Sequence, residues 1–124
     1  MNKLDVNKLA LTIVAIVVMA TLSLAQGQQG KTFKGEIMDS MCASMGGHSP
    51  GGYEATHTHS PEDCTLACVK AGSKFVLYNP AKKTTMELSD QEKARDFAGK
   101  KVNVKGTYDK ATRTIHVDEI QAAS

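Results

Sequence analysis

Three cysteines and three histidines lie within residues 42–68 of this 124-residue chain, a grouping that could bind a metal ion. Cys64 and Cys68 are four residues apart, so on a helix their side chains would point to the same side, one turn apart. Cys42 and one imidazole would complete a set of three sulfur atoms and one nitrogen, as in tetrahedral Cys3His zinc sites. The spacing therefore predicts a metal site that includes all three cysteines.

Three histidines compete to supply the nitrogen ligand. We favour His48, because Gly46 and Gly47 before it allow the backbone to fold back toward the cysteines. His57 and His59 are the additional candidate ligands, although for each of them we prefer the interpretation as an exposed histidine in the loop. The predicted ligand set is therefore Cys42, His48, Cys64 and Cys68.

Methionines near Cys42 leave the identity of the metal open. Met41 and Met45 flank Cys42 and are further candidate ligands. Thioether and thiolate sulfur atoms are soft ligands that prefer Cu(I), so copper is the alternative to zinc. Met38 lies within a predicted strand, where methionine is an ordinary core residue.

The odd number of cysteines also allows two readings without a metal. A disulfide from Cys42 to Cys64 or Cys68 would leave one free thiol and stabilise a small domain by about 3 kcal/mol on chain-entropy grounds. A bridge between Cys64 and Cys68 is disfavoured, because their parallel Cβ directions suit the disulfide torsion poorly. Thiol redox chemistry is the third reading, although Cys64 and Cys68 do not form the Cys-x-x-Cys motif of thioredoxin-like sites.

The N-terminal residues have the features of a secretory signal peptide. Lys3 and Lys8 precede an apolar run from Leu9, and small residues around Ser23 and Ala25 form a cleavage site. We expect a signal peptide at residues 1–25, removed near Ala25, and a periplasmic or secreted protein with no stable membrane insertion. An uncleaved anchor is the alternative, since residues 9–25 just reach the roughly 17 residues that span a bilayer.

Charge and motifs restrict the partners. The chain has a net charge of +2, which falls to +1 without residues 1–25, so no strong field favours nucleic acid. No glycine-rich phosphate loop or serine–histidine–acid arrangement is recognisable, and a thiol near histidines is the only feature that an enzyme could use. We therefore expect a monomeric binding module whose partner is a metal ion or an unknown envelope protein.

Period-two alternation and turn residues divide residues 31–124 into strands and helices behind a flexible leader at 26–30. Ser60 and Pro61 begin one predicted helix that Gly72 ends, and Ser89 begins a second that runs to Phe97. Residues 39–60 are rich in glycine and are expected to form an irregular loop. The predicted strands cover residues 31–39, 74–78, 83–88, 102–108 and 114–120.

This order of elements is that of an OB-fold. The sequence predicts a mainly β protein, a single small five-stranded OB-like antiparallel barrel at residues 31–124. A helix lies between strands 3 and 4, and a Cys/His-bearing loop-helix insertion lies between strands 1 and 2. An open antiparallel sheet with two helices packed on one face is the alternative architecture.

The segments GEIMDSMCA, CTLACVKAGSKFVLY and FAGKKVNVKGTYDKATRTIHVDEI resemble a family of small exported bacterial proteins, frequent in soil acidobacteria, catalogued as a domain of unknown function. The resemblance extends from about Lys31 to Ile120. It implies export and a barrel-like domain, but no activity. Its most specific features are the strand Gly99–Gly106, with the pattern Gly-x-x-Val-x-Val-x-Gly, and the constellation Asp39, Cys42, His48, Cys64 and Cys68.

Overall fold

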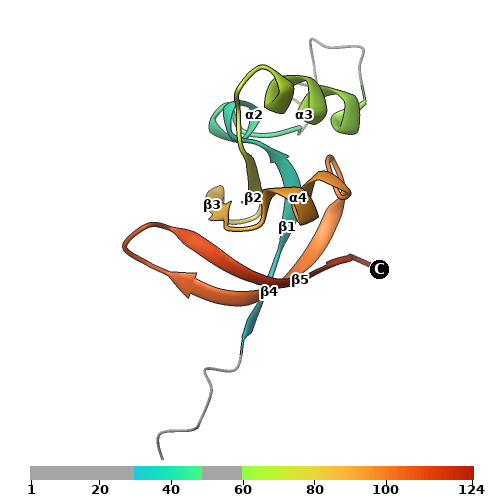
Figure 1. Ribbon diagram of the computed structural model, residues 1–124. Coiled ribbons are helices and arrows are strands. Elements are labelled where there is room, and N and C mark those ends of the chain that lie inside the picture. The colour runs from blue at the N-terminus through green and yellow to red at the C-terminus, as the bar shows by residue number, and fades with distance from the viewer. Residues whose placement is uncertain (1–29, 49–59) are drawn as a thin grey trace, which may run out of the picture.

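The computed structural model describes residues 30–48 and 60–124 (Figure 1). The predicted signal peptide, most of the leader, and the candidate ligands His57 and His59 lie outside these residues. The described part is mainly β, with five strands and three helices. In chain order they are β1 (Lys31–Asp39), α2 (Ser40–Ser44), α3 (Pro61–Lys70), β2 (Phe75–Asn79), β3 (Thr84–Leu88), α4 (Gln91–Arg95), β4 (Lys101–Asp109) and β5 (Thr114–Ala122).

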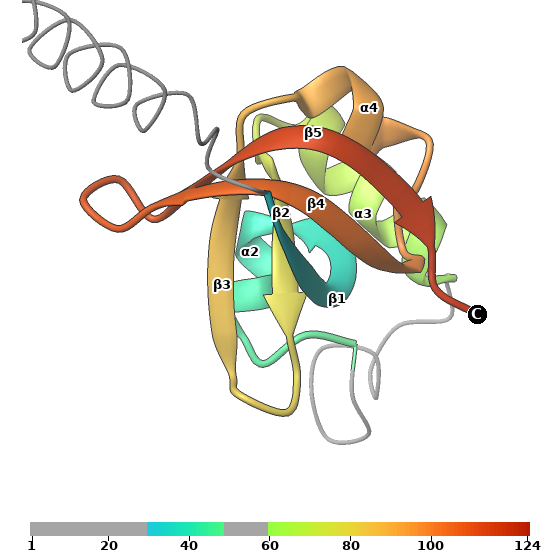
Figure 2. The same ribbon diagram turned by 90° about the horizontal axis from the view of Figure 1, so that it is seen from below.

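The five strands pair in the order β1-β2-β3-β5-β4 and close into a barrel. Closure depends on the length of β1, whose first half pairs with β4 and whose second half pairs with β2. This pairing differs from the open sheet considered as the alternative architecture. Figures 1 and 2 show the β4–β5 hairpin projecting beyond the rest of the sheet.

One strand pair corrects the predicted all-antiparallel barrel. β3 and β5 run parallel, with Glu87 opposite Thr114 and Leu88 opposite Ile115. In a closed ring of five strands, neighbours cannot all alternate in direction, so one pair must be parallel. The remaining four pairings are antiparallel.

The barrel core follows the alternation seen in the sequence. Val102, Val104 and Gly106 of β4 are buried, as predicted, and β5 contributes the buried Ile115. Gly106 lies so close to the backbone carbonyl of His116 that a Cβ atom would not fit. The main cluster is completed by apolar residues from β1, β2, β3 and α4, among them Ile37, Phe75, Leu77, Leu88 and Ala94.

The helices differ from the prediction in two places. Residues 40–44, expected to be irregular, form α2, because Asp39 Oδ1 accepts hydrogen bonds from the backbone N–H groups of Met41 and Cys42 at the helix N-terminus. α4 is shorter than predicted. Asp90 caps it, while the Ser89 hydroxyl accepts a hydrogen bond from the backbone N–H of Val117 in β5.

α2 and α3 lie at the same end of the barrel, at the top in Figure 1 and behind the strands in Figure 2. α3 begins where predicted, with the Ser60 hydroxyl accepting a hydrogen bond from the backbone N–H of Asp63. Gly72, with φ +115°, follows its last turn. Among the described residues, no helix is both long and apolar enough to cross a membrane.

Candidate metal centre

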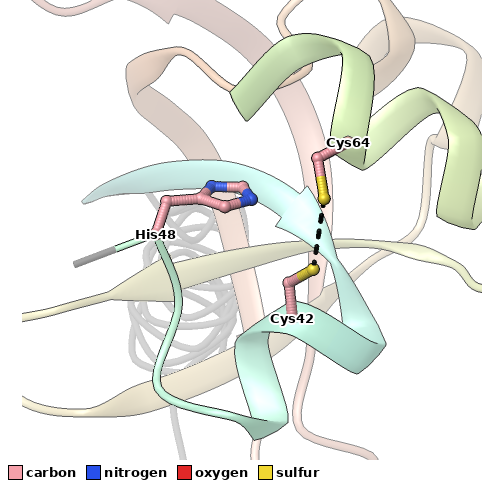
Figure 3. Close-up of side chains that lie close together, drawn as sticks. All are labelled: Cys42, His48 and Cys64. Atoms are coloured by element: carbon pink, nitrogen blue, oxygen red, sulfur yellow. Dashed lines mark hydrogen bonds between the residues drawn. The ribbon is translucent and has the colours of Figure 1, made fainter. Parts of the chain in front are cut away.

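Two short helices position the first two thiols. Cys42 lies in α2, directly after β1, and is fully buried, whereas Cys64 lies in the first turn of α3 and is half-buried. Their Sγ atoms are 3.8 Å apart (Figure 3). Residues 22 positions apart in the chain therefore meet at the end of the barrel.

A glycine turn brings His48 to the same place. Gly46 and Gly47 have φ angles of +96° and +75°, values that L side chains rarely adopt, and the Gly47 N–H donates to the Cys42 carbonyl at 2.9 Å. A Cβ at Gly47 would lie 2.8 Å from the ring of Tyr78. As expected from the sequence, the two glycines turn the chain back, and the His48 ring points toward the two sulfur atoms (Figure 3).

Glu36 of β1 holds the His48 ring from the other side. The Nδ1 atom of His48 and Oε1 of Glu36 are 2.9 Å apart, and the two side chains are 3% and 16% exposed. His48 Nε2 is buried and has no hydrogen-bond partner among the described residues. Glu36 was not predicted as part of the site, because strand alternation indicates only that its side chain faces away from the core and does not reveal a contact twelve residues later in the chain.

Cys42 belongs to two groups of candidate ligands. Ligand atoms of Cys42, His48 and Cys64 lie within 4.8 Å of one another, and the same limit holds for Asp39, Cys42 and Cys68. The structure thus places His48, Cys64 and Cys68 near Cys42, but Cys68 belongs to a different group from His48 and Cys64. The structure adds Asp39, whose Oδ2 is buried and has no hydrogen-bond partner in the described part of the chain.

The predicted methionine ligands lie at the surface. Met41 is 57% exposed and Met45 is 46% exposed, so neither is buried with the thiols. Met38 is fully buried and packs in a small cluster with Ala43, Val76 and Tyr78, which confirms its prediction as a core residue.

The protein environment favours the neutral thiol at Cys42 and at Cys68. Burial is the largest cause that raises the pKa of Cys42 far above its ordinary value, and the neighbouring Asp39 carboxylate raises it further. Burial followed by the Asp39 charge also raises the pKa of Cys68. A raised pKa disfavours a freely nucleophilic or redox-active cysteine, and a metal ion bound here would have to displace the thiol protons.

All three cysteines are free thiols in the structure. The 3.8 Å between the sulfur atoms of Cys42 and Cys64 exceeds the roughly 2.05 Å of a disulfide bond. The two atoms are nevertheless close enough for a small movement to join them, so this pair is the disulfide alternative that the geometry favours.

Comparison with known protein families gives a match that covers much of the barrel and contains none of the candidate ligands. Residues 69–123 match the model of a family described as "Protein of unknown function (DUF5818)". The match agrees with the expected resemblance to a domain of unknown function, and it runs from the end of α3 through β5. Cys42, His48, Cys64 and Cys68 all precede it. No curated protein and no solved structure matches the chain.

Proposed function

We propose that this protein is a binding module that holds a soft or borderline metal ion, zinc or copper, through Cys42, His48 and Cys64, with Cys68 as fourth ligand. The observation that carries the proposal is the buried Nε2 atom of His48, which has no partner among the described residues. A buried polar atom left unpaired costs about 1–3 kcal/mol. A metal ion between this nitrogen and the two thiolates would remove that cost.

The contact with Glu36 supports the same role for His48. A carboxylate only accepts hydrogen bonds, so a bond from His48 to Glu36 Oε1 places the imidazole proton on Nδ1. In the neutral ring, Nε2 then carries the free electron pair that a metal ion requires. A histidine ligand that donates its other N–H to a carboxylate is a recurrent arrangement in metal sites.

The spacing of the sulfur atoms also suits one shared ion. With zinc–sulfur bonds of about 2.3 Å in a tetrahedral arrangement, two thiolate ligands lie about 3.8 Å apart. The Sγ atoms of Cys42 and Cys64 are 3.8 Å apart, which matches this spacing. Since trigonal Cu(I) sites give a similar spacing, the distance supports metal binding without selecting the metal.

The proposal also includes the fold type, location, oligomeric state and lack of catalysis that the sequence predicts. The strand order β1-β2-β3-β5-β4, with α4 between β3 and β4, supports an OB-type barrel. Export, a monomeric state and the absence of catalysis are proposed from the sequence.

The test is metal analysis of the protein purified from an exporting host without chelator. Native mass spectrometry should show bound metal, and thiol counting under denaturant should give three reactive thiols. His48→Gln should lose metal, whereas His116→Gln is the matched control, because His116 is exposed on β5. A protein with three free thiols that binds neither zinc nor copper would refute the proposal.

A second candidate function is a disulfide-stapled interaction domain of the cell envelope, with no metal and no catalysis. The approach of Cys42 to Cys64 favours it. A surface hollow of about 520 Å³ offers a binding surface, and the rings of Phe33 and Tyr108 pack against each other in its wall. Three cations also line the hollow and form no ion pair among the described residues, namely Lys34, Lys82 and Arg113. A mass two hydrogens below the reduced chain, with one reactive thiol, would favour this function.

A further inference from the structure

Cys42 and the four candidate ligands around it form two overlapping groups. Cys42, His48 and Cys64 make up one group, and Asp39, Cys42 and Cys68 make up the other, each with its ligand atoms within 4.8 Å of one another. Cys42 is the only residue that the two groups share. Three protein ligands are enough to bind a zinc ion whose remaining position is taken by another molecule.

Each group contains one buried polar atom that has no hydrogen-bond partner among the described residues. In the first group this atom is His48 Nε2, and in the second it is Asp39 Oδ2. An ion held by Cys42, His48 and Cys64 gives a partner to Nε2 and leaves Oδ2 unpaired. The Cys42 thiol interacts with the Asp39 carboxylate, but metal binding removes the thiol proton, so Oδ2 then needs another partner.

Capping of α2 does not explain the second oxygen of Asp39. The cap uses Oδ1, which accepts hydrogen bonds from Met41 at 3.0 Å and from Cys42 at 2.9 Å. Asparagine or serine would cap equally well without a charge. Asp39 is nevertheless a fully buried carboxylate, which is unfavourable unless a positive charge lies nearby. Within the described residues, Asp39 forms no ion pair.

The charges of the cluster are balanced by two divalent ions. Three metal-bound thiolates and the Asp39 carboxylate carry four negative charges in a largely buried site. One divalent ion would leave two of these charges uncompensated, and burial strongly disfavours uncompensated charge. A second divalent ion makes the set neutral.

We propose that the cluster binds two zinc ions that share the Cys42 thiolate. His48 and Cys64 complete the first site, which is the site of the proposed function, and this inference rests on it. In this arrangement Cys68 is not the fourth ligand of the first ion. It binds the second ion, together with Asp39 Oδ2. Binding releases the thiol protons to solvent, and no electron transfer is involved.

The experiment is titration of the metal-free, reduced protein with Zn²⁺, followed by native mass spectrometry. The unsubstituted protein should bind two ions and Asp39→Asn one, since asparagine keeps the α2 cap and removes the carboxylate. Asp90→Asn is the matched control and should bind two, because Asp90 caps α4 in the same way away from the cysteines. Cys68→Ser should also bind one ion, which tests the second site without altering Asp39.

The outcomes separate the two proposals. One ion in the unsubstituted protein, or two ions in both Asp39→Asn and Cys68→Ser, overturns the shared-thiolate site and leaves the proposed function intact. No zinc in the unsubstituted protein overturns the two-ion proposal, and the proposed function falls as well if the protein does not bind copper either. If the unsubstituted protein binds one ion and Asp39→Asn binds none, Asp39 is a ligand of a single site, and the two-ion proposal is overturned.

Discussion

Gly99 fixes the position of α3 and so of Cys64, and Gly99→Ala tests this role. Gly99 has a φ of +71°, and its N–H donates to the carbonyl of Ile37 in β1 at 2.7 Å. A Cβ there would lie 2.6 Å from the carbonyl carbon of Pro61 and 2.8 Å from Glu62 Cα, both in the first turn of α3. The overlap is with backbone, so α3 would have to move by about 1 Å to restore ordinary contact.

The size of the effect follows from two costs. An L side chain at positive φ costs about 1–2 kcal/mol, and overpacking costs about 1–3 kcal/mol. We therefore expect Gly99→Ala to lower the free energy of unfolding by about 3 kcal/mol, which lowers the Tm of a domain this size by about 12–24 °C. Metal affinity should also fall, because displacement of α3 separates Cys64 from Cys42.

Urea denaturation in the presence of chelator measures the stability change without a contribution from bound metal. Gly72→Ala is the control, since Gly72 has a φ of +115° at the other end of α3 and a Cβ there would have no neighbour within 4 Å. Gly72→Ala introduces the strain of an L side chain at positive φ, but its Cβ atom overlaps with no neighbouring atom. If Gly99→Ala is no more destabilising than Gly72→Ala, close packing at Gly99 does not hold α3 in place.

Three further predictions concern the ligands and the caps. Glu36→Gln should weaken metal binding about 10–100-fold by competition titration, and an unchanged affinity would exclude Glu36 from orienting His48. Hydrogen bonding to Lys93 lowers the pKa of Asp90, so its stabilising effect is present above the ordinary value of 3.8 and is lost as the pH falls below it. Asp90→Asn should therefore reduce the loss of stability as the pH falls below about 4, as measured by urea denaturation, and a pH curve parallel to that of the unsubstituted protein would contradict this. Chelation should accelerate amide hydrogen exchange in α3 and leave β4 unchanged, and equal acceleration in both would point to global loosening instead.

The barrel strands could be predicted from the sequence because their pattern is local. Val102 and Val104 alternate with polar residues, and the pairing of β4 with its neighbours buries that face. The parallel pairing of β3 with β5 could not be read from either strand, because it results from closure of the whole ring. α2 was missed because its start depends on one side chain, Asp39, at the end of a strand.

The candidate ligands were predictable in type but not in their surroundings. The spacing of Cys64 and Cys68 indicates a shared helix face, and two glycines indicate that the chain turns before His48. The contact between His48 and Glu36 joins a strand to a turn twelve residues later, and no periodicity encodes such a pair. Asp39 was part of a recognisable constellation, but its free oxygen becomes visible only when its hydrogen bonds are known.

The packing of α3 explains why a cross-link at Cys42 would matter to this fold. Thr65 is the only fully buried residue of α3, and it is polar, with a hydroxyl that has no partner among the described residues. Leu66 and Val69 are only partly buried against the core. A ten-residue helix with so little apolar burial is marginal on its own. An ion or disulfide that joins Cys64 to Cys42 would attach α3 to α2, directly after β1. The candidate site would therefore stabilise the same helix that carries two of its three sulfur ligands.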